Sequence, residues 1–162
     1  MLRPTWLAAS MIVSGALACS ARGPESAGEA ERAVLEAYVH AWNTHDSIAF
    51  DTILAPAGVH EDIALGFRGE GPAQVRGFLR QIIAQEPDFR WHLTAVYPRD
   101  SVVAAEWTWA GTYTGPGPNG PLVNAPDSGR GASVAVIRHG RIERFTDYHD
   151  VASFFAPAAS VH

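Results

Sequence analysis

The chain has 162 residues, of which 47% are hydrophobic and 18% charged, so it is long and apolar enough for one packed domain. Its formal net charge is −5 and its twelve basic residues, all arginines, are scattered along the chain, which argues against nucleic-acid binding. The single cysteine, Cys19, excludes a disulfide framework within the chain and a cysteine-rich zinc site.

The first eighteen residues have the pattern of an export signal. Arg3 supplies a positive charge, and an uncharged, mostly apolar run extends from Pro4 to Ala18. The run is shorter than the about 20 residues that a membrane-spanning helix needs. A charged start, an apolar middle and a small-residue end are typical of a secretory signal. We therefore expect residues 1–18 to be a signal peptide.

The end of this signal, Ala16-Leu17-Ala18-Cys19, resembles a bacterial lipobox, in which cleavage precedes a cysteine that is then lipidated. The resemblance implies an exported lipoprotein whose lipid on Cys19 anchors it in a membrane, and Ser20 favours the outer membrane or the periplasmic face. The same residues form an A-x-A site, so the alternative is a secreted or periplasmic protein with a free thiol. Residues 19–28 would then be a flexible tether.

Three helices are predicted before the main strands. Ser26 and Glu29 form a capping-box pattern that introduces an apolar stripe at helical spacing. Asp46 is placed to cap a second helix, and Pro72 stands where a first helical residue belongs. The predicted order is helix Gly28 to Asn43, helix Ser47 to Leu54, strand Val59 to Leu65, turn Gly66 to Gly71, and a helix that starts at Pro72 and is stopped by Pro87.

Beyond Pro87 the period of the apolar residues changes from 3.6 to 2, which predicts strands. His139-Gly140 is a tight hairpin signal. The predicted order is strand Phe89 to Tyr97, strand Ser101 to Thr114, Gly- and Pro-rich loop Gly115 to Gly129, strands Ala132 to Arg138 and Arg141 to His149, and a helical turn Val151 to Phe155. Helices first and antiparallel strands last indicate an α+β fold, with the helices on one face of a curved sheet.

Two segments carry a family resemblance. The strand from Trp107 to Pro116, WTWAGTYTGP, and the last strand from Gly140 to Asp150, GRIERFTDYHD, are similar to strands of the SnoaL-like branch of the nuclear transport factor 2-like superfamily. The end of the last strand, from Asp147 to Asp150, also resembles the D-Y-F-D of limonene-epoxide hydrolases. The resemblance spans about Glu31 to Phe155 and places a SnoaL-like domain at 29–156, with a tail at 157–162.

This resemblance implies a cone-shaped, cystatin-like fold: a strongly bent antiparallel sheet, closed by three N-terminal helices around an apolar cavity. Members of the superfamily include polyketide cyclases, ketosteroid isomerases, epoxide hydrolases and dehydratases, and others only bind ligands or proteins. The fold alone does not choose among these activities. The fold often dimerises, so a homodimer through the outer face of the sheet is expected.

Asp147 is the first catalytic candidate, because it matches the acid/base aspartate of the resembling families. A carboxyl group in an aromatic cavity has its charged form disfavoured, so its pKa should rise. His149, His60 and Asp62 are the further candidates, which could orient Asp147 or hold a water. Each of the four has a structural alternative, as a helix cap, an ion-pair partner or a satisfied core residue.

Strand alternation supplies the expected ligand-binding wall. It places these aromatic residues toward the cavity: Phe89, Trp91, Trp107, Trp109, Tyr113 and Phe145. They would suit a small hydrophobic or ring-bearing ligand, although an ordinary core is the alternative. The same alternation puts Tyr97 and Glu143 on the inward faces of their strands. No cofactor is expected, and no metal site either, because no H-E-x-x-H or similar spacing occurs.

One departure from the hydrolase pattern bears on the reaction. Aligned through Glu106, the places of the hydrolases' second charged pair hold Trp107 and Trp109. That argues against epoxide hydrolysis and leaves isomerisation, cyclisation or binding. Two hypotheses therefore stand: a cofactor-independent acid/base isomerase, cyclase or hydrolase that uses Asp147, and a non-catalytic ligand-binding or partner-docking lipoprotein.

Overall fold

A computed structural model describes the backbone of residues 24–150 and the side chains from residue 28 onward. The expected signal peptide, the lipid site at Cys19 and the segment after Asp150 lie outside the described residues. The elements in chain order are α1 (Pro24–Thr44), α2 (Phe50–Ile53), β1 (Leu54–Asp62), β2 (Phe67–Glu70), α3 (Gly71–Gln85), β3 (Arg90–Arg99), β4 (Val102–Gly115), β5 (Leu122–Arg138) and β6 (Arg141–His149).

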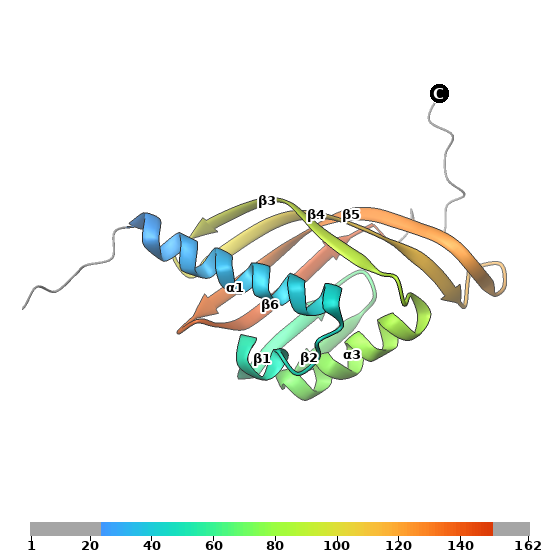
Figure 1. Cartoon of the computed structure of the whole chain (residues 1–162), viewed down its shortest axis with the longest axis horizontal. Coiled ribbons are helices and arrows are strands. Elements are labelled where there is room, and N and C mark those ends of the chain that lie inside the picture. The colour runs from blue at the N-terminus through green and yellow to red at the C-terminus, as the bar shows by residue number, and fades with distance from the viewer. Residues whose placement is uncertain (1–23, 151–162) are drawn as a thin grey trace, which may run out of the picture.

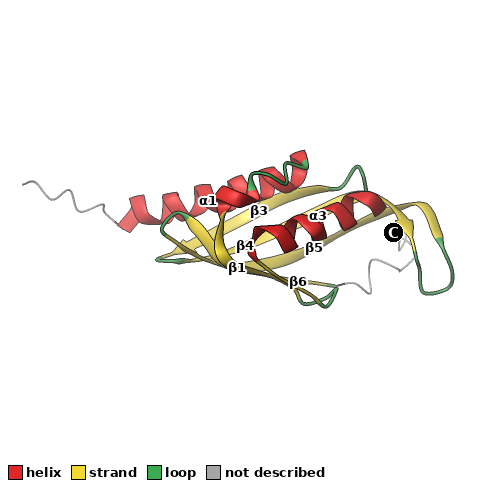
Figure 2. Ribbon diagram, turned by 90° about the horizontal axis from the view of Figure 1, so that it is seen from below, coloured by secondary structure: helices red, strands yellow, loops and turns green. Residues whose placement is uncertain are grey.

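The described strands form one curved sheet in the order β2-β1-β6-β5-β4-β3 (Figure 1). Neighbouring strands are antiparallel except β1 and β6, which are parallel, so the sheet is mixed where the sequence predicts an antiparallel one. Helices α1 and α3 lie on the same face of this sheet (Figure 2), α1 mainly against β3 and α3 mainly against β1. The predicted α+β class, with helices on one face of a curved sheet, is confirmed.

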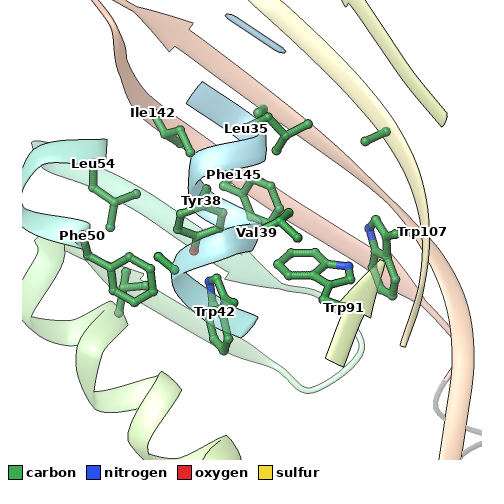
Figure 3. Packing of buried hydrophobic residues seen from close by; sticks show 14 of the residues in the cluster. Leu35, Tyr38, Val39, Trp42, Phe50, Leu54, Trp91, Trp107, Ile142 and Phe145 are labelled. Atoms are coloured by element: carbon green, nitrogen blue, oxygen red, sulfur yellow. The ribbon is translucent and has the colours of Figure 1, made fainter. Parts of the chain in front are cut away.

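Helix α1 supplies one side of the core. Its apolar stripe lies at i, i+3, i+4 and i+7 spacing from Leu35 to Trp42, and the Tyr38 side chain is fully enclosed. Figure 3 shows Tyr38 between Phe50 of α2 and Phe145 of β6, and the ring centroids are 5.4 and 4.8 Å from that of Tyr38. Aromatic rings at such distances add to the burial energy of the core. This packing holds α1 against the sheet.

Two parts of the chain are strand where the sequence predicts turn or loop. Residues Phe67–Glu70 form β2, which pairs with β1, and β5 begins at Leu122, inside the predicted loop. Glycine lowers strand propensity in both segments, and proline also does so in β5, but the backbone groups of β1 and β4 need partners, and pairing supplies them. The first helix also begins at Pro24, ahead of the predicted capping box.

Two register shifts turn side chains away from the faces that simple alternation predicts. The shift between Leu93 and Ala95 of β3 leaves Tyr97 on the outside, 55% exposed. A second shift lies in β6, where Ile142 is buried and Glu143 forms an ion pair with Arg138 instead of facing the interior. None of the helices described is long and apolar enough to cross a membrane.

Candidate active site

A cavity of about 350 Å³ lies between the helices and the concave face of the sheet. Its wall is mainly aromatic and comes from α1, α3 and the strands β1, β3, β4 and β6. Nine of the ten predicted catalytic and ligand-binding residues line it: His60, Asp62, Phe89, Trp91, Trp107, Trp109, Tyr113, Asp147 and His149. Sequence alternation therefore assembles most of this wall, and the remaining candidate is placed differently.

Phe145 does not line the cavity, although the sequence predicts a ligand contact there. Its side chain is fully buried, and its ring centroid lies 4.8 Å from that of Tyr38 and 5.2 Å from that of His60. Phe145 points to the concave face as predicted, but α1 covers it (Figure 3). It therefore belongs to the core that supports the cavity floor.

Asp147 is the carboxyl group at the centre of a buried hydrogen-bond chain. Its Oδ2 lies 3.2 Å from Nε2 of His60, and Nδ1 of His60 lies 2.6 Å from the Tyr38 hydroxyl. The three side chains come from β6, β1 and α1. The parallel pairing of β1 with β6 sets Asp62 opposite Asp147, which brings His60 within reach of the carboxyl group. The chain thus extends from the cavity wall into the closed core.

The other oxygen of Asp147 is held from the neighbouring strand. The Ser133 hydroxyl of β5 donates to Oδ1, and the Trp107 indole N–H of β4 donates to the Ser133 oxygen at 2.6 Å. Because Trp107 occupies the serine oxygen as an acceptor, the serine proton is directed at Asp147. Sequence reasoning misses Ser133 and Tyr38, since neither position carries a motif. In the sequence, only the alternation of β5 indicates that Ser133 points inward, and only the apolar stripe of α1 indicates that Tyr38 does.

Burial favours the protonated forms of Asp147 and Tyr38 in this hydrogen-bond chain. Desolvation raises the pKa of Asp147 above its ordinary value, although the hydrogen bonds from His60 and Ser133 lower it. Burial likewise raises the pKa of Tyr38 well above its usual range, so Tyr38 keeps its proton. A phenol that donates to Nδ1 of His60 leaves the His60 proton on Nε2, directed at Asp147.

His149 and Asp62 form a second pair beside the first. Nε2 of His149 lies 3.0 and 3.1 Å from the two carboxylate oxygens of Asp62, which also accepts the N–H of Leu65. Burial lowers the pKa of His149, but the hydrogen bond and charge of Asp62 outweigh it, so the pKa is raised. The imidazole ring packs on Trp107 and Trp109, with centroids 5.8 and 5.3 Å away. His149 and Asp62 therefore form the part of the cavity wall next to the two tryptophans.

Two glycines of β5 make room for those tryptophans. Gly131 lies opposite Trp107 and Gly129 opposite Trp109 in the β4–β5 pairing. A Cβ atom on either glycine would collide with the indole ring of its partner. The indoles therefore lie flat over β5, where a larger residue would push them into the cavity.

A further buried acidic pair, of which Glu86 lines the same cavity, is not predicted from the sequence. Glu86, which directly follows α3, hydrogen-bonds with Asp127 of β5, and both are buried. Burial and the neighbouring Asp127 raise the pKa of Glu86 to about 8. Among the described residues, no group of three or more His, Cys, Asp or Glu side chains is arranged to hold a metal ion.

The family of the chain follows from a family model, described as SnoaL-like domain, that matches residues 35–145. The match covers more than half of the chain, so the chain belongs to the SnoaL-like domain family. Tyr38, His60 and Ser133 lie within this match, and Asp147 lies two residues beyond its end, in the last part of β6. A comparison with curated protein sequences finds no match.

Solved structures share the fold. A candidate polyketide cyclase of Xanthomonas campestris pv. campestris matches with a TM-score of 0.69 and 24% identity over 80% of this chain and 97% of its own. An LEH-like epoxide hydrolase of M. tuberculosis matches with a TM-score of 0.63 and 23% identity over 79% and 88%. A protein of Catenulispora acidiphila with a ketosteroid isomerase-like fold, in complex with trimethylamine, matches with a TM-score of 0.66 and 23% identity over 75% and 88%. At these identities the likeness shows the fold alone.

Proposed function

We propose that the chain is a cofactor-independent acid/base enzyme that uses Asp147 to move a proton on a small hydrophobic ligand. One observation carries the proposal: the Asp147 carboxyl group lines an aromatic cavity and lies within hydrogen-bond reach of His60 and Ser133. A buried carboxyl group with fixed partners can take or give a proton without rearranging its surroundings. The family membership agrees with such chemistry in a cavity of this kind.

The hydrogen bonds from Tyr38 to His60 and from His60 to Asp147 would hold Asp147 in a fixed orientation as the base. Tyr38 donates to His60, and His60 donates to one oxygen of Asp147, so the carboxylate is oriented by a hydrogen-bond chain that begins in the core, at Tyr38. After Asp147 takes a proton from the ligand, the same partners hold the acid in position to return that proton elsewhere on the ligand. Proton transfer of this kind serves isomerisation or cyclisation.

Epoxide hydrolysis fits the site less well. Trp107 and Trp109 stand where the epoxide hydrolases carry their second charged pair, and both indole N–H groups are already engaged, with Ser133 and Asp127. Among the described residues, no arginine lines the cavity beside Asp147 to help open an epoxide. We therefore place isomerase or cyclase chemistry ahead of hydrolysis.

A general probe of buried carboxylate bases tests the proposal without the natural substrate. 5-Nitrobenzisoxazole loses a carbon-bound proton to a base, its N–O bond breaks, and the coloured phenolate is measured directly. We expect turnover by the wild-type chain and a loss of about 10²–10⁴-fold in Asp147→Asn. Asp88→Asn, which removes an exposed carboxylate, is the control and should keep the rate. Equal rates in Asp147→Asn and the wild type would reject Asp147 as the base.

The alternative is a protein that binds its ligand without reaction. It is favoured by one feature of the same site: both oxygens of Asp147 are engaged and the residue is only 6% exposed. A chain that binds small hydrophobic molecules in titrations, yet leaves 5-nitrobenzisoxazole at its background rate, would establish this alternative.

We further propose export and lipid anchoring, on the pattern of residues 1–18 and the lipobox-like residues before Cys19. A lipoprotein in the outer membrane or at the periplasmic face would present the cavity close to a bilayer. Radioactive palmitate fed to cells that express the chain should label it, and Cys19→Ala should abolish the label. Labelling that survives unchanged in Cys19→Ala would contradict Cys19 as the lipid site, and a wild-type chain that takes up no label would favour a secreted or periplasmic protein.

A homodimer through the outer face of the sheet remains a proposal. That face carries the exposed apolar side chains Val102 and Tyr148, 42% and 51% exposed. Light scattering on the purified chain would settle the oligomeric state, and Tyr148→Glu should dissociate a dimer formed there. A monomer at micromolar concentration would exclude it.

A further inference from the structure

The Glu86–Asp127 pair is a second buried acidic centre, which reaches the cavity through Glu86 and has no role in the acid/base chemistry assigned to Asp147. Glu86 is 5% and Asp127 6% exposed. The backbone of Glu86 is fixed, since its N–H donates to the Ile82 carbonyl and its carbonyl accepts the Phe89 N–H. Across the cavity wall, a Cβ on Gly111 would lie 3.2 Å from Oε1 of Glu86, so the missing side chain leaves room for the carboxyl group.

The two carboxyl groups are partners of each other and leave oxygens without other donors. Asp127 Oδ2 accepts the Trp109 indole N–H at 3.1 Å. Oδ1 of Asp127 and Oε1 of Glu86 receive no donor hydrogen from any described residue. Two carboxyl groups can hydrogen-bond with each other only if one keeps a proton. The pair therefore keeps one proton and one negative charge in a buried place. Burying this charge is unfavourable, and no described cationic side chain compensates for the lost hydration.

Among the described residues, no arginine neutralises this pair. Within residues 28–150, no arginine forms an ion pair or hydrogen bond with Glu86 or Asp127, and none lines the cavity. The titratable groups that act on the pair are Asp88 and Tyr113, together with His149, whose ring is paired with Asp62. A buried negative centre without its own cation is suited to a cation that arrives from outside.

Aromatic rings surround the same part of the cavity. Phe89, Trp109 and Tyr113 line the wall together with Glu86. Tyr113 is close enough to the pair for Glu86 and Asp127 to raise its pKa, after burial itself. The face of an aromatic ring attracts a cation, and rings around carboxylates are the usual surroundings of alkylated ammonium groups.

We propose that the Glu86–Asp127 pair binds the ammonium head of a hydrophobic amine whose other end reaches Asp147. The inference rests on the proposed function, since it names the class of the ligand on which that site acts. Asp127 and Ser133 lie on the same face of β5, six positions apart, or about 20 Å of extended strand at most. The ammonium head is thus a binding handle away from the reacting end, with the tryptophans along the ligand between.

Choline and its uncharged carbon isostere, 3,3-dimethylbutan-1-ol, test this proposal. Both are titrated into the purified full-length chain, and the tryptophan fluorescence reports binding. We expect choline to bind about tenfold more tightly than the alcohol at pH 9. The preference should shrink toward pH 6, because Glu86 then keeps its proton while choline keeps its charge. Equal affinities, or tighter binding of the alcohol, would overturn the proposal, as would a preference for choline that does not change with pH.

Variants separate this proposal from that of Asp147. Glu86→Gln and Asp127→Asn should each reduce the affinity for choline about tenfold and leave that for the alcohol unchanged. Asp147→Asn should lose turnover of 5-nitrobenzisoxazole but keep the preference for choline. Loss of the preference in Asp147→Asn, or its survival in Glu86→Gln, would contradict the assignment to the Glu86–Asp127 pair. If Asp127→Asn fails to fold, the nearly isosteric Glu86→Gln still decides the question.

Discussion

The side-chain amide of Asn43 forms hydrogen bonds with both backbone groups of Trp91: Nδ2 donates to the carbonyl and Oδ1 accepts the N–H, each at 2.7 Å. Trp91 belongs to β3, the last strand of the sheet order, so the amide takes the place of a missing neighbouring strand for one residue. It also ties the end of α1 to the strand that carries a cavity wall residue.

Asn43→Ala should therefore destabilise the chain. The substitution leaves an N–H and a carbonyl of a half-buried strand without partners, which costs about 1–3 kcal/mol. Urea unfolding measures the change in the free energy of unfolding. Asn119→Ala, at an exposed residue, is the control and should stay within about 0.5 kcal/mol of wild type. Equal stabilities of the two variants would show that the Asn43 amide adds nothing to the edge of the sheet.

Ser133→Ala should move the pH dependence of proton transfer by Asp147. The serine hydroxyl stabilises the carboxylate and lowers the raised pKa of Asp147, so its loss raises that pKa further. A base works only when ionised, and the rate should therefore rise at a higher pH in the variant than in the wild type. The rate of 5-nitrobenzisoxazole opening, measured across the pH range, reports this midpoint. Ser128→Ala, an exposed position on the same strand, should not move it; a midpoint that stays in place in Ser133→Ala would remove the serine from the site.

Gly131→Ala should both destabilise the chain and narrow the cavity. The added methyl group collides with the Trp107 indole and lies 2.6 Å from the carbonyl oxygen of Tyr148, so the ring must move toward the cavity. Overpacking of this kind costs about 1–3 kcal/mol. Gly77→Ala, whose added methyl group would have only Arg80 within 4 Å, should instead stabilise α3 by about 0.5–1 kcal/mol. Thermal melts of both variants, with ligand titrations, check the prediction, and an unchanged Gly131→Ala would refute it.

Glu86 should make the chain less stable as the pH rises. Its folded-state pKa is about 8, against an ordinary value of 4.5, so the folded chain binds its proton more tightly than the unfolded chain. The resulting stability is fully present below about pH 4.5 and is lost as the pH rises through about 8. The expected loss is on the order of 2 kcal/mol, less than the full shift implies, because Glu86 lines a cavity and shares its proton with Asp127.

Glu86→Gln supplies the comparison. Glutamine carries no titrating proton, so the variant should lose less stability than wild type between pH 5 and pH 8.5 when both are unfolded in urea. The two chains should differ most at the alkaline end, with the variant the more stable one. Parallel stability curves across this range would contradict a protonated Glu86.

The sequence predicts the concave face of β4, and that of β6 from Phe145 onward, because the alternation there is regular and the inward residues are mostly large. This alternation correctly predicts that Trp107, Trp109, Asp147 and His149 line the cavity. The sequence-based prediction is wrong where strand pairing in the folded sheet overrides the local strand propensity of a segment. The early part of β5, with its glycines and prolines, has little strand propensity, so Asp127 cannot be placed from the sequence. Tyr97 fails for another reason, because a register shift within β3 leaves no mark in the residue pattern.

The last strand of the described chain is inserted in the middle of the sheet, between β1 and β5. His60 and Asp147 are 87 residues apart, and neither lies near its partner until that insertion is complete. During synthesis, the β1–β2 hairpin therefore cannot pair with the rest of the sheet until β6 has been made, because β6 is the strand that joins β1 to β5. Folding should be slow and cooperative for a domain of this size, since the contacts that matter span most of the chain. A chain that loses its final strand to a protease would lose the acid/base centre at once, and no partly active fragment should survive.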